Sequence, residues 1–384
     1  MIGQQGVLEI SASRVAANVA LFRQRLGGGG VEICATVKAN AYGHGLAEVL
    51  PALRKCGVAW ACVYSLPEAL DVVRLSPGMK VLVLSPVVLT ERAAELPAEA
   101  LRTLTAGEVR VDVVDRESAR RLAQQVARSA PGRRVRIHVQ VDTGLTRAGV
   151  AREEALGLIE AIMAAPGLML EGVFSHLSHG DVPGHETVAR HVERLREVAE
   201  PVQRRLPGLM VHLQNSGGAW HVAGSAGLGL DMVRVGIALY GLQPSLEDVI
   251  PELKPIARLV APVLAIHERP AGVGVGYGHT FTTKRASRLA IVPVGYADGY
   301  PRCLSNKGVV QIGGRTAPVV GRVSMDQVII DVTDVPAHVG DEVTVFAWDP
   351  AAPNCIDGVA VACGTIGYEI ATGLGHRLTR RIVD

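Results

Sequence analysis

Two basic residues of this chain stand in apolar surroundings, where a buried charge is expensive. Lys38 directly follows a largely apolar run at 31–37, and Arg234 lies inside another at 232–241. A lysine amine kept neutral, by desolvation or by a neighbouring cation, can attack an aldehyde and form a Schiff base. An unpaired buried guanidinium costs on the order of several kcal/mol, so Arg234 requires a partner that packing alone does not supply.

Polar residues follow three further apolar runs: Arg147 in QVDTGLTRAG, His176 and Asp181 in FSHLSHGD, and Asn215 and Ser216 in QNSGG. The hydroxyl of Ser216 and the backbone N–H groups of nearby glycines, such as Gly236, can bind a phosphate. An amine, phosphate donors and a buried cation together suggest a site for pyridoxal phosphate.

Residues such as Lys38 and His176 also have ordinary structural explanations, whereas Arg234 does not. A lysine at the end of a strand is usually solvated, and a histidine after an apolar strand is often a hydrogen-bonded core residue. Spacing alone therefore leaves open whether the set forms a cofactor site.

The segments that must position these residues alternate between two patterns. Continuous apolar runs, typical of strands buried on both faces, occur at 31–38, 60–65, 80–86, 109–115, 135–142, 170–176, 210–216 and 232–241. Amphipathic helical periodicity appears between them at 67–75, 117–128, 152–165 and 187–206. This alternation predicts a TIM-type (β/α)8 barrel, whose functional side chains follow the C-terminal ends of the strands. No glycine-rich GxGxxG turn follows the first strand, which disfavours a doubly wound sheet.

The pattern changes after residue 241. Short β-rich segments at 257–266, 288–294, 309–312, 327–332 and 342–346 are separated by Gly, Pro, Asp and Asn. We therefore expect a cofactor-binding barrel at 11–241 and a mostly β domain at 242–384. The N-terminal strand, within 1–10, is predicted to join the β domain.

Composition argues against several classes of protein. Lys+Arg (39) and Asp+Glu (37) nearly balance, so nothing favours binding to nucleic acid or to an acidic membrane surface. The N-terminal segment lacks a signal-peptide pattern, and no apolar run reaches the length of a membrane span. The six cysteines show no CxxC pair and no metal-ligand spacing. We expect them to be reduced core residues of a cytoplasmic protein without a metal site.

Nine blocks in a fixed order resemble the alanine racemases, which are fold-type III pyridoxal-phosphate enzymes. They are VKANAYGHG, VDTGLTRAGV, FSHLSHGD, NSGG, VRVGIALYGL, GYGHTF, VPVGYADGYPR, GRVSMDQ and GTIGYEI. The resemblance spans essentially the whole chain, and that family's barrel followed by a β domain agrees with the pattern above. It implies interconversion of L-alanine and D-alanine, either supplying D-alanine for peptidoglycan or degrading it.

The resemblance also implies two catalytic bases on opposite faces of the substrate. Lys38 would carry pyridoxal 5′-phosphate covalently and act as the base on the D-face. Tyr277 would remove the α-proton of the L-isomer, while Arg147 and the backbone of Met325 would bind the substrate carboxylate. In the family Tyr277 and Met325 come from the other subunit, so the expected assembly is a homodimer with shared active sites.

Further roles follow from the same resemblance. The cofactor would be held by Lys38, Tyr42, His176, Asn215, Ser216, Arg234, Gly236, Ile237 and Tyr368. Arg234 would hydrogen-bond the pyridine nitrogen, and His176 would link it to Tyr277. Tyr277 and Tyr368 would form the inner entrance, with Asp181, Tyr296, Arg302, Arg322 and Ile366 further out.

One position departs from the pattern of that family. Many members have a carbamylated lysine that orients the arginine, whereas the residue seven positions before Arg147 is Gln140. A neutral amide orients a cation weakly, so we expect Arg147 to be oriented either less strongly or by a bound anion such as chloride near Gln140.

Three alternatives belong beside this interpretation. Barrel-only relatives bind pyridoxal phosphate without racemase activity, but this chain has a β domain that carries Tyr277. Decarboxylases of the same fold type need a β-domain cysteine and an acidic constellation that GRVSMDQ does not resemble. A serine or broad-specificity racemase of the same family is closer, and Tyr368, which would narrow the pocket, favours alanine.

Overall fold

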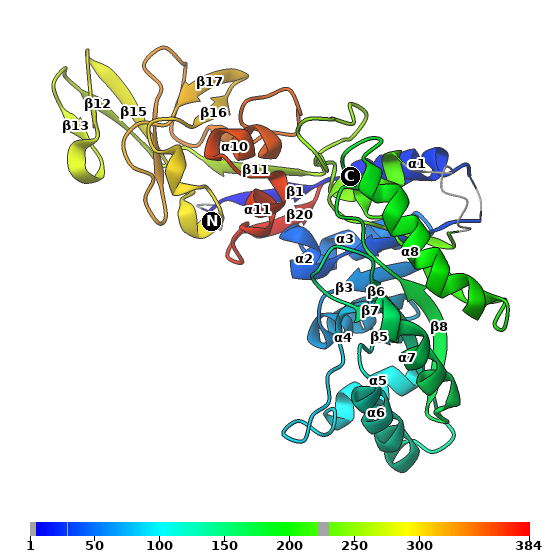
Figure 1. Cartoon of the computed structure of the whole chain (residues 1–384). Helices are drawn as coiled ribbons and strands as arrows, with labels where there is room; N and C mark the ends of the chain where they lie inside the picture. Colours follow the sequence, from blue (N-terminus) through cyan, green and yellow to red (C-terminus); the bar gives the residue numbers. More distant parts are fainter. Residues whose placement is uncertain (1–4, 29, 222–229) are drawn as a thin grey trace.

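The computed structural model describes residues 5–28, 30–221 and 230–384 of the chain. A barrel occupies one end of the molecule, and an elongated β region extends from it (Figure 1).

Among the described residues, eight parallel strands close into a barrel. They are β2 (Glu32–Thr36), β3 (Trp60–Val63), β4 (Lys80–Pro86), β5 (Val109–Asp112), β6 (Val135–Asp142), β8 (Leu168–Phe174), β9 (Met210–His212) and β10 (Met232–Val235). Each strand pairs in parallel with the next, and β10 pairs with β2 to complete the ring. The (β/α)8 fold class predicted from the sequence is confirmed. The two-residue strand β7 (Val150–Ala151) adds only a short extension beside β6.

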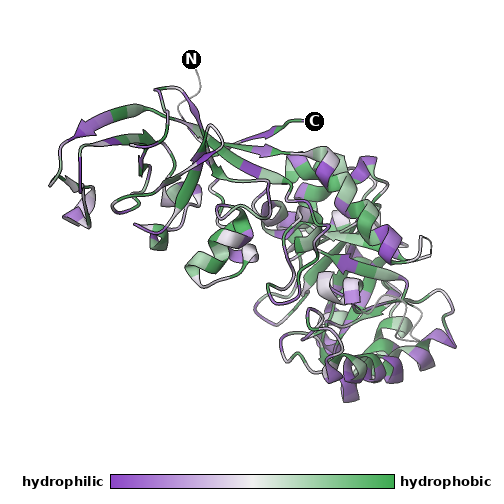
Figure 2. Cartoon of the chain, turned by 90° about the horizontal axis from the view of Figure 1, so that it is seen from above, coloured by the Kyte–Doolittle hydropathy of each residue, from purple (hydrophilic) through white to green (hydrophobic). Residues whose placement is uncertain are grey.

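Helices follow the strands and cover the outside of the barrel. They include α1 (Ala12–Arg25), α3 (Leu46–Lys55), α4 (Leu66–Leu75), α5 (Ala98–Ala106), α6 (Arg116–Ser129), α7 (Arg152–Ala164), α8 (Glu186–Gln203) and α9 (Ser216–His221). The side chain of Asp115 caps α6 by accepting from the N–H of Ser118, and apolar Leu122 and Val126 of that helix are buried. Figure 2 shows mostly hydrophobic strands inside and hydrophilic outer faces on the helices.

The second region is built from short, mostly antiparallel strands. A six-stranded sheet has the order β17 (Arg315–Pro318), β16 (Val309–Ile312), β19 (Glu342–Phe346), β11 (Ala257–Pro262), β1 (Val7–Ile10) and β20 (Thr379–Ile382). Smaller sheets contain β12 (Ala265–Arg269), β15 (Ser287–Val292) and β18 (Val328–Asp331), and β13 (Gly274–Val275) with β14 (Phe281–Thr282). The expected single strand at 257–266 is therefore two strands in different sheets.

The N-terminal strand pairs with strands of the second region. β1 lies antiparallel to β11 and parallel to β20, so residues from both ends of the chain share one sheet. This pairing agrees with grouping the first residues with the β domain, although the bounds of the two domains stay predictions.

A short helix of the second region lies next to the barrel mouth. It is α11 (Gly367–Thr372), which packs on the turn α2 (Lys38–Tyr42) and also on the helix α10 (Ile356–Cys363). Gly43, at the end of that turn, has no room for a side chain, because a Cβ would lie 2.0 Å from the carbonyl oxygen of Ala371. The β region thereby touches the segment that carries Lys38.

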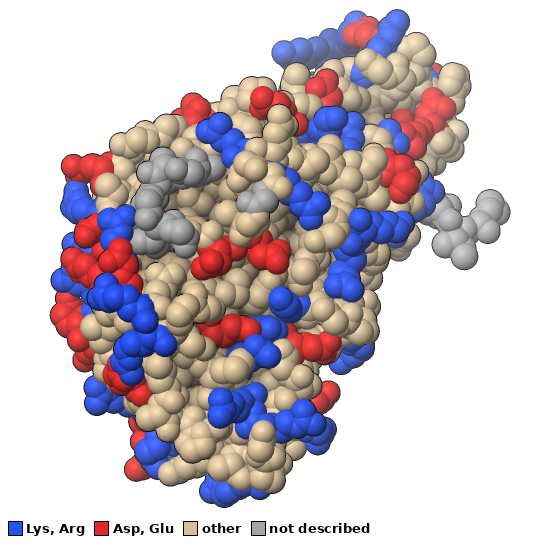
Figure 3. Space-filling model, turned by 90° about the vertical axis from the view of Figure 1, so that its right-hand side faces the viewer, with Lys and Arg blue, Asp and Glu red and all other residues tan. Residues whose placement is uncertain are grey.

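On the face of the barrel shown in Figure 3, basic and acidic side chains intermingle, as the near-equal counts lead one to expect. In the described part of the chain, no helix has the length and apolar character needed to span a membrane.

Candidate active site

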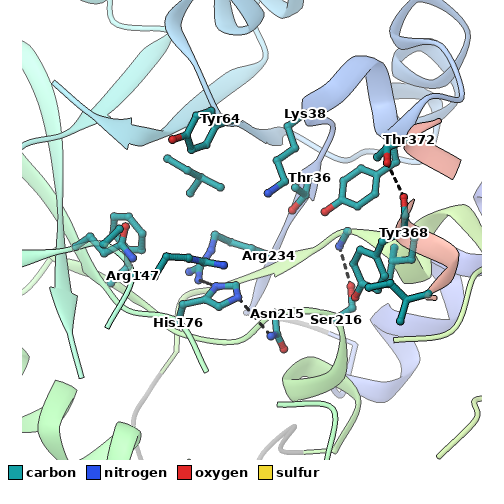
Figure 4. Close-up of a pocket in the computed structure, with 18 of the residues that line it drawn as sticks. Thr36, Lys38, Tyr64, Arg147, His176, Asn215, Ser216, Arg234, Tyr368 and Thr372 are labelled. Carbon is teal, nitrogen blue, oxygen red and sulfur yellow. Dashed lines mark hydrogen bonds between the residues drawn. The ribbon is translucent and has the colours of Figure 1, made fainter. Parts of the chain in front are cut away.

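A cavity of about 670 Å³ opens at the C-terminal ends of the barrel strands (Figure 4). It brings together eleven of the residues singled out from the sequence: Lys38, Tyr42, Arg147, His176, Asn215, Ser216, Arg234, Gly236, Ile237, Ile366 and Tyr368. Gln140 lines it too, as do Thr36, Tyr64 and Thr372, which the sequence analysis did not identify.

Lys38 begins a left-handed turn rather than ending a strand. The strand β2 stops at Thr36, so its predicted extension to residue 38 is wrong. The four residues after Lys38, from Ala39 to Tyr42, all have φ between 52° and 56°. Non-glycine residues in this conformation cost roughly 1–2 kcal/mol each, so other contacts must hold the turn. Lys38 makes no hydrogen bond or ion pair with any described residue, and its amine points into the cavity (Figure 4).

Contacts from distant parts of the chain hold this turn. Glu68 accepts from the N–H of Ala39 at 2.8 Å, and the side chain of Asn40 accepts from the N–H of Leu46 at 2.8 Å. Arg380, 337 residues further on, donates to the carbonyl oxygen of Gly43 at 2.8 Å. These bonds offset the backbone strain and fix the direction of Lys38.

Hydroxyl groups and backbone amides gather at one end of the cavity. Ser216 Oγ accepts from the N–H of Gly236 at 2.9 Å, which leaves its own hydrogen available to a ligand. A Cβ on Gly236 would lie 2.7 Å from the hydroxyl oxygen of Tyr42, so only glycine leaves this space open. Burial raises the pKa of the Tyr42 phenol. Burial and then the charge of Asp181 do the same for Tyr368. Both phenols therefore stay protonated and can donate.

The segment after Arg234 differs from its prediction. The strand β10 ends at Val235, and residues 237–240 form the 3-10 helix η1 (Ile237–Tyr240), not the end of a strand. The N–H of Ile237 consequently lies in the first turn of a helix, where no intrahelical acceptor is available.

Arg234 has the partners that its burial requires. It donates to Nδ1 of His212 at 2.6 Å, to the carbonyl oxygen of Ser175 at 2.7 Å and to Nδ1 of His176 at 3.1 Å. Its guanidinium also lies over the ring of Phe174, 5.2 Å from the centroid. The cation is thus fixed in the barrel with one edge facing the cavity (Figure 4).

A buried hydrogen-bond chain, which the sequence analysis missed, continues from Arg234 through the barrel interior. An arginine only donates, so His212 accepts at Nδ1 and carries its proton on Nε2. That proton is donated to Nδ1 of His138 at 2.9 Å, and Nε2 of His138 donates to Glu171 at 3.1 Å. Glu171 also accepts from Arg110 at 2.7 Å. The signal in the sequence was a histidine or glutamate inside each of three segments predicted as buried strands: His138, Glu171 and His212.

His212 and His138, the two histidines of this hydrogen-bond chain, are both neutral. Burial, and then the charge of Arg234, lower the pKa of His212 well below its usual range. Burial also lowers the pKa of His138, although Glu171 opposes it. The hydrogen-bond chain therefore runs from the cation Arg234 to the anion Glu171, and each group donates to the next one along it.

His176 is also neutral, and one of its ring nitrogens faces the cavity. Burial, followed by the charges of Arg234 and Arg147, lowers its pKa well below the usual range. Since Nδ1 accepts from Arg234, the proton sits on Nε2. The nitrogen Nδ2 of Asn215 lies 3.5 Å away, but it is itself a donor, because Oδ1 of that amide accepts from Gly218. The Nε2–H is therefore available to an acceptor in the cavity.

Arg147 and Gln140 line the same wall. Asp142 accepts from the N–H groups of Gly144 and Thr146 and so shapes the loop that presents Arg147. Arg147 makes no hydrogen bond or ion pair with any described residue. The N–H of Gln140 donates at 2.9 Å to the buried Asp112, whose other carboxylate oxygen has no partner within the described chain. Burial raises the pKa of Asp112 to about 8.

The remaining predicted residues do not reach this cavity. Tyr277, Tyr296, Arg302, Arg322 and Met325 line a separate pocket of about 710 Å³ in the β region. Tyr277 belongs to η2 (Tyr277–His279), directly after β13, which Figure 1 places at the far end of the molecule from the barrel. The side chains of Tyr277 and Met325 are 71% and 52% exposed. Asp181 lies by Tyr368 and lines neither pocket.

Comparisons with known proteins cover nearly the whole chain. The family model "Alanine racemase, N-terminal domain" matches residues 10–244, and "Alanine racemase, C-terminal domain" matches residues 256–382. An alanine racemase of Chlorobaculum tepidum is 35% identical, over 97% of this chain and 94% of its own length. The structure of alanine racemase from D-cycloserine-producing Streptomyces lavendulae superposes with a TM-score of 0.88 at 30% identity, covering all of this chain and 98% of that one. That of Bartonella henselae, with covalently bound pyridoxal phosphate, has a TM-score of 0.81 at 29% identity and 99% coverage of both chains.

Proposed function

This chain belongs to the alanine racemase family of isomerases, and on that premise we propose that it interconverts L-alanine and D-alanine with pyridoxal 5′-phosphate bound at Lys38. One observation carries the proposal: an unpaired lysine amine points into a cavity that has a fixed cation on one side and a set of hydroxyl and amide donors on another.

The residues present fit this cofactor. The hydroxyl groups of Ser216, Tyr42 and Tyr368 and the N–H of Ile237 would hold a phosphate, in the space that a side chain at Gly236 would fill. Arg234 would face the ring nitrogen, with His176 and Asn215 beside it. When bound, the cofactor supplies an aldehyde and a conjugated ring that make the α-hydrogen of an amino acid acidic.

Arg234 would favour racemisation over side reactions. A guanidinium is effectively never deprotonated in proteins, so beside the ring nitrogen it would donate a hydrogen bond and leave that nitrogen unprotonated. Four acceptors keep Arg234 in place: the rings of His212 and His176 and the carbonyl oxygens of Ser175 and Leu213. An arginine at this position would therefore limit how far the ring withdraws electrons from the substrate, and would favour proton return over transamination.

Two bases would act on opposite faces of the substrate. The amine of Lys38 would accept and return the proton on the D-face. The partner subunit's Tyr277 would serve the L-face, since a single chain keeps Tyr277 in a separate pocket from Lys38. A free tyrosine has a pKa of about 10 and is a weak base at neutral pH. The Nε2–H of His176 would donate to its oxygen and thereby favour the ionised form.

We therefore propose a homodimer in which each barrel cavity is completed by the other subunit. The exposed Tyr277 and Met325 in one chain, and the open barrel mouth in the other, are the surfaces that such a dimer would join. Tyr296, Arg302, Arg322, Ile366 and Asp181 would then line the outer entrance. Arg147 and the backbone of Met325 would bind the substrate carboxylate, with an anion such as chloride as a proposed neighbour of Gln140. A cytoplasmic location stays a prediction.

A direct assay tests the activity. Purified protein with cofactor is incubated separately with L-alanine, D-alanine and L-serine, and the enantiomers are separated on a chiral phase. We expect both alanine isomers to reach a 1:1 mixture, faster than serine by tenfold or more, and Lys38→Ala to abolish this. Comparable rates for serine would favour a broad-specificity racemase. Loss of carbon dioxide without enantiomer formation would favour a decarboxylase, and binding without turnover would favour a cofactor carrier.

The covalent link has its own test. Reduction of the cofactor-loaded protein with borohydride, followed by digestion, should leave the chromophore on the peptide that contains Lys38. Labelling at another lysine would overturn the assignment.

A further inference from the structure

Two cysteines that are 60 residues apart in sequence meet in the β region. The sulfur atoms of Cys303 and Cys363 lie 2.9 Å apart. Cys303 belongs to the short helix η4 (Arg302–Leu304) and is exposed, while Cys363 is the last residue of α10 and is half-buried. The expectation that all six cysteines are core residues is therefore wrong for this pair.

The other cysteines have different surroundings. Cys34 and Cys62 also contact each other, but both are buried, as is Cys355. Cys56 is half-buried with no sulfur partner among the described residues. The thiolate is the form of cysteine that reacts with oxidants, and reactive cysteines in proteins are at least partly exposed to solvent. Of the six, Cys303 is the exposed one, so an oxidant in solution meets its sulfur first.

The neighbourhood of the pair favours a bond between the two sulfurs over other chemistry. Burial, and then the hydrogen bond with Cys303, raise the pKa of Cys363 to about 12, so Cys363 is protonated when Cys303 first reacts. A structural metal site needs further ligands, and no group of three His, Cys, Asp or Glu side chains able to hold a metal occurs in the described ranges. The helices η4 and α10 pack directly on each other, so the two sulfurs are held together by the fold.

We propose that Cys303 and Cys363 are a thiol–disulfide site, which closes into an intramolecular disulfide when the protein meets a peroxide. The thiolate of Cys303 attacks one peroxide oxygen, the O–O bond breaks, and hydroxide leaves as a sulfenic acid forms on Cys303. The sulfur of Cys363 then attacks that sulfur, the S–O bond breaks, and the second oxygen leaves as water. In sum, two thiols lose two electrons and two protons, and hydrogen peroxide becomes two molecules of water.

The position of the pair gives the crosslink a place beside the active site. Cys303 directly follows Arg302, and Cys363 lies three residues before Ile366. Both of these neighbours line the outer entrance if the function proposed above holds. The crosslink would join the segment that contains Arg302 to the segment that contains Ile366. The disulfide chemistry itself does not depend on the proposed function.

The test uses the full-length, cofactor-loaded protein. It is treated with hydrogen peroxide, then unfolded in iodoacetamide, digested and mapped by mass spectrometry. We expect the number of alkylated cysteines to fall from six to four per chain, with a peptide pair joined through Cys303 and Cys363. Dithiothreitol before alkylation should restore all six.

Matched variants make the outcome decisive. Cys303→Ser should keep Cys363 fully alkylated after the same treatment, while Cys56→Ser should form the crosslink as the wild type does. Peroxide should also raise the Tm of the wild type and leave that of Cys303→Ser unchanged, because the bond closes a long loop. Alkylation of both Cys303 and Cys363 after treatment would overturn the proposal. So would oxidation of Cys303 that stops at sulfinic acid without a crosslink.

Discussion

Arg234 and Glu171 lie at the two ends of one hydrogen-bonded chain through the barrel, with the neutral rings of His212 and His138 between them. The direction of every bond in this chain is set by its ends, because Arg234 can only donate and an ionised Glu171 can only accept. The carboxylate thus compensates, at a distance, the cation that faces the cavity.

Glu171 should therefore contribute strongly to stability. Burial raises its pKa, but hydrogen bonds from His138 and Arg110 outweigh that and lower it well below the usual range. Glu171→Gln should destabilise the protein by about 3–5 kcal/mol in urea unfolding, since it leaves buried cations uncompensated. The control Glu160→Gln breaks an exposed ion pair with Arg205 and should cost less than about 1 kcal/mol. Equal losses for the two variants would contradict this role.

The lowered pKa of Glu171 also sets a pH dependence. A carboxyl group with a folded-state pKa below its unfolded value of about 4.5 stabilises the protein above that value. This contribution should be lost as pH falls from about 5 toward 2, and Glu171→Gln should remove that part of the wild-type acid dependence.

Asp112 should make the protein less stable as pH rises, which is opposite to the pH dependence that Glu171 causes. Its pKa of about 8 in the folded protein exceeds the unfolded value of 3.8, so the folded state holds a proton that the unfolded state releases. Its contribution is complete below about pH 4 and is lost as pH rises toward 8, with a slope near 1.4 kcal/mol per pH unit. Asp112→Asn keeps an acceptor for the N–H of Gln140 and removes the titration.

The measurement for Asp112 is the difference in unfolding free energy between variant and wild type at pH 6.5, 7.25 and 8. Comparing the two proteins cancels the histidines and also Asp357, whose pKa burial raises to about 6. A difference that stays constant across this window would show that Asp112 is ionised throughout.

Tyr277→Phe tests the division of labour between the two bases. The variant keeps Lys38, so D-alanine should still exchange its α-proton with deuterated solvent, while exchange from L-alanine should fall at least 100-fold. Proton NMR of each isomer in deuterium oxide follows both reactions. Equal losses for the two isomers would argue against separate faces.

Mixing subunits tests the shared site. A heterodimer of Lys38→Ala and Tyr277→Phe chains has one cavity with both bases if they come from different subunits. After exchange at equal amounts, roughly a quarter of wild-type activity should return. Two bases from one chain predict no recovery, because each chain in the mixture lacks one of them.

Chloride should affect substrate binding if an anion lies between Gln140 and Arg147. Raising chloride at constant ionic strength, with acetate as the replacement, should lower KM for alanine several-fold and change kcat little. In Gln140→Lys the chloride response should shrink and bicarbonate should stimulate activity instead. A KM that ignores chloride in the wild type would show that protein groups alone position Arg147.

The barrel was predictable because its strands are buried on both faces. The segments at 80–86 and 135–142 match β4 and β6 at both ends, since each is an apolar run that stops at a polar or proline-containing turn. The strands predicted at 31–38 and 232–241 are longer than the strands β2 and β10 that the structure has there. In both, residues past the last ladder bond stay apolar but coil into a left-handed turn or a 3-10 helix.

Site residues that follow barrel strands could be predicted from the sequence. Contacts between residues that only tertiary packing brings together could not. Lys38, His176 and Ser216 follow strands that end at one face, so the topology itself brings them together. Cys303 and Cys363 meet only because η4 packs on α10, and nothing in their spacing indicates it.

The left-handed turn at Lys38 depends in part on a residue that is synthesised near the end of the chain. The bond from Arg380 to the carbonyl oxygen of Gly43 joins residues 337 positions apart, and β20, which contains Arg380, pairs with the N-terminal strand β1. On the ribosome, the barrel sequence emerges long before Arg380 does. A nascent chain can therefore form its barrel while the strained turn still lacks one of its supports. We therefore expect a chain truncated before Arg380 to keep the bonds from Glu68 and Asn40 but to hold the turn, and with it the amine of Lys38, less firmly.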